Sequence, residues 1–584
     1  MREVISFLFI IFPSCFLSGQ DYPQDFFRVP VDSFTRLAGN FGEIRHDHFH
    51  YGWDISTKGK EGMKVVAAGD GYVSRIKTGP EGYGKVIYIT HPNGYVTVYA
   101  HLSSYNNSIT KYVEGAQYLN ENYEVELFPS KDQLVFLKGD LIAYSGNTGF
   151  SDAPHLHFEI RDEKTEEIIN PYLFGIKVPD HVKPFFITLG VYPQDDSSAV
   201  NGISAQHYFK LQEKNNGFRL PASDSIVVSG NIGFGVEVYD REDNSNGRNQ
   251  VYSLEFQLDG KRIYYFEMKR FAFDQSRYVN CHIDYYAQRE KKMNIQRAYL
   301  KPGNKFPDYA DVVNSGILSF NDESVHSGKF IAKDHAGNIS EFSFKFRCIK
   351  KRAFPHEFSW PVGPGKICSG AMISKMDDIE SAYSDTSEVM TLNYRIEPNT
   401  FIEPYRFAWC FPQDTSFYKN EYSKVISFPF NFYPLLKPIT ISLRCTRLPA
   451  DSLLDKLLIA EVDGNGIKRS KGGEYKKGRV ETSTFSLGTF AVAIDTIPPV
   501  IREPKNTNIT SLKKLEFRIT DDLSGIGSYR VTVDGKWVLF EYEPKLRSLF
   551  CKNDSRLPKG KHTIKVLVID KKKNSRTEWF TYTK

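Results

Sequence analysis

Two common signatures of zinc proteins are absent from this sequence. Its 7 cysteines form no C-x-x-C pair, and the 584 residues contain no H-E-x-x-H stretch. The first absence argues against a cysteine-ligated zinc site, and the second excludes a helix that carries two histidine ligands and a glutamate base. The spacing of the cysteines assigns no disulfide partners, so bridged cysteines and buried free thiols both remain open.

Long apolar runs are confined to the N-terminus. There, Arg2 precedes an apolar stretch from Ile5 to about Leu17, which predicts a secretory signal peptide over residues 1–20. No other segment approaches the roughly 20 apolar residues that a membrane-spanning helix needs. We therefore expect an exported protein in the periplasm, the cell envelope or the extracellular space, without a transmembrane span.

No segment concentrates positive charge beside stacking aromatic residues, as nucleic-acid binding would require. Lys and Arg number 75 against 70 Asp and Glu, a net charge of +5, so we expect no nucleic-acid partner. Tyr and Phe, which favour strands, number 34 and 44. Because the chain is also too long for a single core, the composition predicts an all-β, multidomain protein.

The first 175 residues are rich in glycine turns and short strands. Residues 86–90 and 95–99 read as strands around Asn93-Gly94, a pair that suits a tight hairpin turn. We expect residues 21–175 to form one antiparallel β-sheet domain. Residues 104–136 are polar, and we expect them to form an insertion or a lid-like loop.

Beyond residue 176 the sequence is β-rich and contains a faint repeat. The repeated patterns are Asp-Gly-Lys at 259–261 and 534–536, Asp-x-x-x-Asn at 334–338 and 570–574, and an opening Asp-x-x-x-Pro at 180–184 and 495–499. Turn residues at matched offsets between strands predict two related, Ig-like β-sandwich modules, at 176–349 (with an insertion) and at 495–584. A β-rich domain of unknown role would occupy residues 350–494.

Half of the 14 histidines lie between residues 46 and 157, which favours a shared site. His155 and His157 alternate in the strand pattern His-Leu-His-Phe-Glu-Ile, so both side chains point to one face of a sheet. His101 ends the strand that follows the hairpin and could reach the same cleft. His91 lies in the hairpin turn, where we expect it to be exposed to solvent.

A carboxylate accompanies these histidines. His50 and Asp54 lie where a loop runs into a strand, and one carboxylate with two imidazoles is a ligand set that suits zinc. His46 and His48 alternate with His50, so the pattern alone does not choose among the three.

The order of these residues resembles that of the lysostaphin-like, LytM-type (β-lytic) zinc metallopeptidases. The resemblance covers about residues 36–172 and includes these further motifs: Phe41-Gly42, the strand pair at 67–73, Gly84 and the hairpin, and Ser-Gly-Asn-Thr-Gly at 145–149. Members of the family often have glycines just before the His-x-His strand. This chain has Phe150, Asp152 and Ala153 there, a departure that concerns the substrate groove more than the metal.

The resemblance implies a small antiparallel β-sheet groove in which one Zn²⁺ is held by His50, Asp54 and His157. It implies that His101 and His155 are catalytic residues outside the metal's ligand shell, one to accept the proton of a water molecule and one to stabilise the oxyanion. The implied activity is that of a secreted zinc metalloendopeptidase that cleaves peptide bonds in peptidoglycan stem peptides or cross-links. The layout also resembles large secreted peptidases of this type that carry Ig-like tails.

Two alternatives remain open from the sequence. Some proteins of this fold lack part of the ligand set and act as catalytically silent, wall-binding activators of other hydrolases, whereas this chain keeps all five positions. Alternatively, the C-terminal β domains would make the chain a surface scaffold that binds regulatory or wall-anchoring partners.

Overall fold

Strands form most of the regular structure in the computed structural model of this chain, which confirms the expected all-β, multidomain class. The structure describes residues 22–34, 36–214, 217–243, 245, 247–350, 368–373, 383–385, 391–403, 405–412, 422–428, 433–504, 507–510, 512–552 and 554–584. The expected signal peptide at 1–20 lies outside these residues. Among the described residues, no helix is both long and apolar enough to cross a bilayer.

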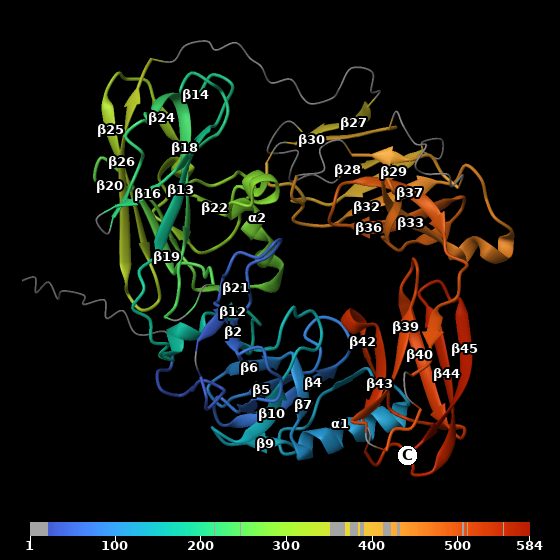
Figure 1. The fold of residues 1–584 in the computed structure, drawn as a ribbon. Coiled ribbons are helices and arrows are strands. Elements are labelled where there is room, and N and C mark those ends of the chain that lie inside the picture. Colours follow the sequence, from blue (N-terminus) through green and yellow to red (C-terminus); the bar gives the residue numbers. More distant parts are fainter. Residues whose placement is uncertain are drawn as a thin grey trace, which may run out of the picture.

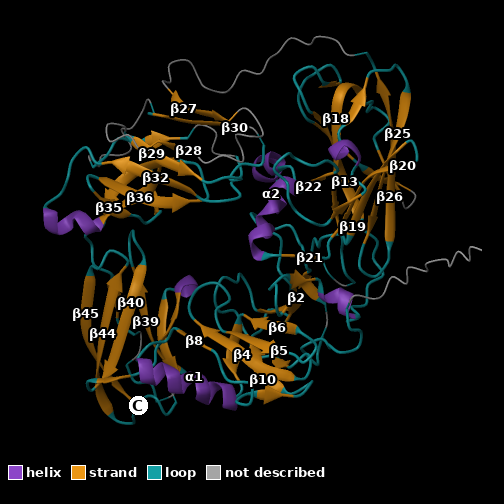
Figure 2. Ribbon diagram, turned by 180° about the vertical axis from the view of Figure 1, so that it is seen from behind, coloured by secondary structure: helices purple, strands orange, loops and turns teal. Residues whose placement is uncertain are grey.

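The chain forms four β modules that follow one another in sequence (Figure 1). Figure 2 shows that the fourth module returns to the first, beside helix α1 (Asn107–Asn120). Tyr118 of α1 packs edge-on against Trp537, with ring centroids 5.0 Å apart. Segments more than 400 residues apart in sequence are therefore in direct contact.

The first module is built on a ten-stranded sheet and a three-stranded sheet. The larger sheet has the order β1 (Leu37–Gly39), β2 (Trp53–Ser56), β11 (His155–Asp162), β6 (Tyr95–Ala100), β5 (Val86–Thr90), β4 (Gly71–Thr78) and β8 (Val125–Leu127), with β9 (Val135–Phe136), β12 (Ile168–Ile169) and β21 (Arg270–Phe271) paired off this path. The smaller sheet has the order β3 (Lys64–Val66), β10 (Leu141–Ser145) and β7 (Leu102–Tyr105). The predicted hairpin is confirmed, because β5 pairs antiparallel with β6.

The polar composition of residues 104–136 led us to expect an insertion or a lid-like loop, but the segment is not a loop throughout. It contains α1, whose first turn is capped by the Asn106 side chain, which accepts the Ile109 N–H at 2.9 Å. Ile109 and Val113, four residues apart, are buried against the first module, since residues at this spacing share one helix face. The amphipathic helix thus offers its other face to the fourth module.

The second module is a thirteen-stranded sheet system. Its strands are β13 (Phe185–Pro193), β14 (Ala199–Val200), β15 (His207–Lys210), β16 (Gln212–Lys214), β17 (Gly217–Arg219), β18 (Val227–Tyr239), β19 (Ser253–Leu258), β20 (Lys261–Glu267), β22 (Ile295–Arg297), β23 (Tyr309–Ala310), β24 (Leu318–Phe320), β25 (Val325–Lys333) and β26 (Ile339–Cys348). Between β20 and β24 the chain passes through β21 and the short helix α2 (Val279–His282). This segment joins the two modules, because β21 pairs with β12 of the first sheet.

The third module has a six-stranded and a five-stranded sheet. Their strands are β27 (Cys368–Ile373), β30 (Tyr405–Cys410), β31 (Ile426–Ser427), β37 (Thr489–Ile494), β33 (Leu457–Asp463) and β34 (Gly466–Ser470), and then β28 (Tyr383–Asp385), β29 (Leu392–Ile396), β32 (Ile439–Arg444), β36 (Arg479–Thr484) and β35 (Glu474–Lys476). Leu392 and Ile459, one from each sheet, lie in one core.

The fourth module has two four-stranded sheets around one core. Their strands are β38 (Val500–Arg502), β39 (Lys514–Thr520), β43 (Ser548–Lys552) and β42 (Glu541–Glu543), and then β41 (Lys536–Trp537), β40 (Ile526–Val533), β44 (Lys561–Asp570) and β45 (Ser575–Thr583).

The repeated sequence patterns of the second and fourth modules form matching turns. Asp259 accepts the Ser327 N–H at 2.9 Å and contacts His326 at 2.7 Å. Asp534 accepts the Thr563 N–H at 3.0 Å and contacts His562 at 2.6 Å. The shared sequence therefore produces shared local geometry, while the Ig-like identity of both modules stays a prediction.

Candidate metal centre

Strand register brings the predicted site residues together. β2 pairs antiparallel with β11, and His157 lies directly opposite Asp54. β11 also pairs with β6, and His157 lies opposite Ala100, so His101 at the end of β6 is next to the same position. His50 precedes β2 in a loop, as the sequence predicts.

Three ligand atoms converge at the centre of this arrangement. His50 Nε2 lies 3.0 Å from Asp54 Oδ1 and 3.1 Å from His157 Nδ1, and His157 Nδ1 lies 2.9 Å from Asp54 Oδ1. Tetrahedral zinc with ligands at roughly 2.0–2.1 Å spaces its donor atoms about 3.3 Å apart. These donors therefore fit one zinc ion in both type and spacing.

The remaining polar atoms of these side chains are held by outer groups. His50 Nδ1 donates to the Asn40 carbonyl at 2.7 Å, and His157 Nε2 contacts Glu159 Oε1 at 2.8 Å. Arg45 donates to Asp54 Oδ2 at 2.7 Å. Such outer contacts fix the orientation and tautomer of metal ligands.

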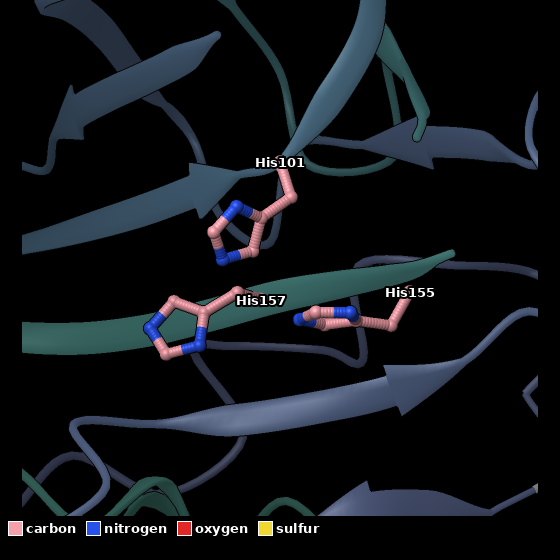
Figure 3. Close-up of side chains that lie close together, drawn as sticks. All are labelled: His101, His155 and His157. Atoms are coloured by element: carbon pink, nitrogen blue, oxygen red, sulfur yellow. The ribbon is translucent and has the colours of Figure 1, made fainter. Parts of the chain in front are cut away.

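His101 and His155 lie beside His157 (Figure 3). Ring nitrogens of His101, His155 and His157 lie within 4.8 Å of one another. His101 Nδ1 donates to the Thr148 carbonyl at 2.8 Å, and His155 Nδ1 to the Ala153 carbonyl at 2.8 Å. His101 adopts a left-handed φ of +58°, a strained conformation for a residue with a side chain. The chain thus turns sharply at His101, where β6 ends and β7 begins.

Burial and close contacts shift the pKa values of the site residues in opposite directions. Burial lowers the pKa of His50 to about 4 and that of His101 to about 3, so both rings favour the neutral form. Burial also disfavours charge on His157, but its hydrogen bonds to Asp54 and Glu159 outweigh this effect and raise its pKa to about 9. The Asp54 pKa lies well below its usual range, because the contacts with His50, His155 and His157 outweigh its burial.

Comparison with known families identifies this part of the chain. Residues 48–124 match the model of peptidase family M23. The first module is an M23 peptidase domain. Residues 405–495 match the model of a Zu5-like domain, which places a Zu5-like β domain in the third module.

Curated relatives match about a quarter of this chain. The chain is 29% identical over 158 residues to the DD-carboxypeptidase/endopeptidase Mpg of Neisseria meningitidis serogroup B, covering 26% of this chain and 30% of that protein. It is 31% identical over 149 residues to the peptidoglycan DD-endopeptidase ShyA of Vibrio cholerae, covering 24% and 29%. It is 30% identical over 149 residues to the murein hydrolase activator NlpD of Salmonella typhimurium, covering 26% and 32%. The chain thus spans less than a third of the length of these relatives.

Solved structures give matches of similar extent. A zinc-containing peptidase from Vibrio cholerae is 24% identical, with 27% of this chain and 41% of that chain covered and a TM-score of 0.20. The catalytic domain of lysostaphin from Staphylococcus simulans is 26% identical, with 21% and 77% covered and a TM-score of 0.16.

The structure separates His50 from its two neighbours in the M23 domain. His48 stacks on Tyr51 with ring centroids 5.2 Å apart and contacts Asp47. Neither His48 nor His46 belongs to a candidate metal-binding group among the described residues. Of the three alternating histidines, only His50 meets Asp54.

Glu159 is a site residue that the sequence argument missed. It is completely buried and contacts His157 Nε2, while Arg161 Nε donates to its other oxygen at 2.7 Å and the Tyr83 hydroxyl donates to it as well. Its position two residues after His157 on β11 was the available signal, because alternate residues of a strand share a face.

His91 is buried in the M23 domain, so the prediction of an exposed turn histidine was wrong. Its side chain is 3% exposed, with Nδ1 2.8 Å from the Asp70 carbonyl and Nε2 2.8 Å from Thr97 Oγ1. Phe26 and Phe27 pack edge-on against the ring, at 5.8 and 5.0 Å between centroids. The N-terminal segment therefore covers a turn that local sequence marks as exposed.

Proposed function

We propose that the M23 domain is a zinc-dependent endopeptidase that cleaves peptide bonds in peptidoglycan stem peptides or cross-links. The convergence of His50, Asp54 and His157, with His101 and His155 beside them, carries this proposal. M23 peptidases are zinc enzymes that act on peptidoglycan, and the relatives Mpg and ShyA are named as endopeptidases. An exported location in the periplasm, the cell envelope or the extracellular space fits this substrate.

His50, Asp54 and His157 would hold the zinc, whose Lewis acidity activates water and a substrate carbonyl. His101 would accept the proton of the attacking water, because its Nδ1–H is committed to the Thr148 carbonyl and leaves Nε2 as an acceptor. His155 Nε2 lies 3.2 Å from Asp54 Oδ1, so this nitrogen lies beside the convergent donors. In its protonated form, His155 would donate a hydrogen bond to the developing oxyanion.

A catalytically silent activator or scaffold of other wall hydrolases is the second candidate. The similarity to the murein hydrolase activator NlpD favours it. The presence of all five predicted side chains around one point supports the enzyme instead, since an activator has no need of a preserved ligand set.

Digestion of purified peptidoglycan by the zinc-loaded chain, with mass analysis of the products, tests the proposal. We expect peptide-cleaved fragments that disappear with chelator and with His50→Ala. His101→Ala should lower turnover roughly 100- to 10,000-fold and keep its zinc. His48→Ala, from the same loop but facing Tyr51, is the matched control and should cleave normally. Intact peptidoglycan together with stimulation of a second hydrolase would establish the activator instead.

A further inference from the structure

Three carboxylates meet where the M23 domain joins the second module. Asp180 lies in the connection that leads to β13, Asp240 directly follows β18, and Asp334 directly follows β25. One oxygen of each lies within 4.8 Å of the others. Asp240 and Asp334 are only 3% and 1% exposed, so two of the three charges are removed from solvent.

Hydrogen bonds satisfy only some of the carboxylate oxygens in this cluster. Asn338 donates to both oxygens of Asp334 at 2.8 Å, and the Val182 N–H donates to Asp180 Oδ1 at 3.0 Å. Asp240 Oδ1 is buried and has no hydrogen-bond partner within the described part of the chain. A buried carboxylate oxygen without a partner costs free energy unless a cation or a proton compensates it.

The charges around Asp240 add to this cost. Burial, and then the carboxylates of Asp334, Asp180 and Glu242, raise the pKa of Asp240 to about 8. Crowded carboxylates with few donors are typical of a site for a hard cation, since calcium takes roughly six to eight oxygen ligands in a flexible shell. No imidazole or thiolate belongs to the group, which argues against zinc.

The fourth module contains a related cluster of Asp495, Asp521 and Asp522, which gives an internal comparison. Asp495 accepts the Ile497 N–H as Asp180 accepts that of Val182, and Asn574 contacts the Asp495 carbonyl as Asn338 contacts that of Asp180. Asp521 follows β39 and, like Asp240, has a buried Oδ1 without a partner among the described residues.

The two clusters differ in their third carboxylate, which is Asp334 in one and Asp522 in the other, and in the residues of one turn. The three residues between Asp570 and Asn574 are Lys571, Lys572 and Lys573, whereas those between Asp334 and Asn338 are His335, Ala336 and Gly337. Lys572 interacts electrostatically with Asp455, Glu474 and Asp495, so this turn of the fourth module carries a positive charge near its cluster. The turn between Asp334 and Asn338 contains no lysine or arginine.

We propose that Asp180, Asp240 and Asp334 bind one calcium ion that fixes the M23 domain to the second module. Contacts between the M23 domain and the second module lie next to the cluster. The His335 ring stacks on Tyr172 with ring centroids 3.9 Å apart, and Glu242 accepts the Leu37 N–H at 2.9 Å. Since Asp180 belongs to the connecting segment, the ion would hold this segment against the strand ends of the second module.

Equilibrium dialysis of the zinc-loaded full chain against radioactive calcium tests the proposal directly. We expect one calcium per chain, with a Kd on the order of 0.1–1 mM, as in extracellular calcium modules. Asp240→Asn should weaken calcium binding at least about tenfold, because it removes one negatively charged ligand and calcium affinity depends on the number of charged ligands. Asp521→Asn, the matched change in the fourth module, should bind as the unaltered chain does. Calcium retention by the unaltered chain no greater than that of Asp240→Asn would overturn the proposal, and so would selective loss in Asp521→Asn.

Thermal unfolding gives a second readout that does not depend on peptidase activity. Calcium should raise the Tm of the unaltered chain and leave that of Asp240→Asn unchanged. If Asp240→Asn does not fold, Asp180→Asn at the half-buried linker position takes its place. Equal calcium responses in the unaltered chain and in the folded variant would overturn the proposal.

Discussion

Lys85 Nζ lies 2.5 Å from Glu541 Oε2, and this ion pair joins the M23 domain to the fourth module. The side chains are 9% and 10% exposed. Burial opposes ionisation of Glu541, but Lys85 outweighs it and holds the pKa of this carboxyl below its usual range. The Lys85 N–H also donates to Thr148 Oγ1 at 3.0 Å, and Thr148 provides the carbonyl that orients His101. Three contacts thus link Glu541 of the fourth module to His101, a proposed catalytic residue.

Replacing Glu541 should loosen this interface. Glu541→Gln leaves Lys85 buried without a counter-charge, which costs about 3–5 kcal/mol in comparable pairs. We expect a lower Tm and faster proteolytic release of the fourth module. Arg530→Ala, which removes the half-exposed pair with Glu121, is the control and should cost less than about 1 kcal/mol. Identical melting of the two variants would show that the buried pair does not secure the interface.

Lys545 makes a second contact from the fourth module, to the loop beside the site. Its ammonium donates to the carbonyl of Ser151 at 2.9 Å and to that of Asn147. Between these residues lies Thr148, and Ser151 Oγ contacts His155 Nδ1 at 3.2 Å. Lys545 therefore binds the loop whose residues contact both His101 and His155.

We expect Lys545→Ala to lower kcat about tenfold on peptidoglycan with no loss of zinc, because small displacements of catalytic groups cost rate. Lys571→Ala is the control, since Lys571 is 60% exposed and lies 4.0 Å from Glu81 at the same interface. An unchanged kcat for Lys545→Ala, or a drop matched by Lys571→Ala, would exclude this positioning role.

The convergence of the metal centre could be predicted from the sequence because its signals are local. Alternation in His-Leu-His-Phe-Glu-Ile placed His155 and His157 on one face, and strand pairing then set His157 opposite Asp54. The choice of His50 over His48 came from the family resemblance and not from the alternation, because it depends on packing in the loop, where the His48 ring stacks on Tyr51.

Contacts between modules could not be predicted. Glu541 meets Lys85 only because two folded surfaces are complementary, and neither residue lies in a pattern that indicates the other. Similarly, Ile109 and Val113 carry a helical spacing, but the polar residues around them obscured it. The repeat of Asp180 and Asp495 was visible in sequence, whereas the orphaned oxygen of Asp240 required three dimensions.

Glu159 should control zinc affinity through His157. Burial opposes its ionisation, but Arg161 and His157 outweigh this and lower its pKa to about 2, so it is charged at neutral pH. Glu159→Gln should weaken zinc binding roughly 10- to 100-fold, as loss of an outer carboxylate partner does. Competition with a chromophoric chelator measures the change. Glu126→Gln, on the exposed edge strand β8 of the same sheet, should bind zinc normally. Equal affinities in both variants would refute the role of Glu159.

His91 should make the M23 domain less stable in acid. Burial lowers its pKa to about 4, whereas an unfolded histidine titrates near 6.5. As the pH falls below about 6.5, the unfolded chain takes up this proton first, so stability is lost progressively down to about pH 4. The difference between the two pKa values corresponds to roughly 3 kcal/mol at full effect.

Urea denaturation at neutral pH and near pH 4 measures this loss. His91→Gln cannot take up the proton, so its stability should fall less between the two conditions than that of the unaltered chain. Other buried histidines keep a residual pH dependence in both proteins. His181→Gln is the control, because His181 is exposed and its contact with Asp243 raises its pKa, the opposite sign. If His91→Gln loses as much stability as the unaltered chain, the buried imidazole must gain a proton in the folded state without penalty, and its enclosure by Phe26 and Phe27 would not hold in solution.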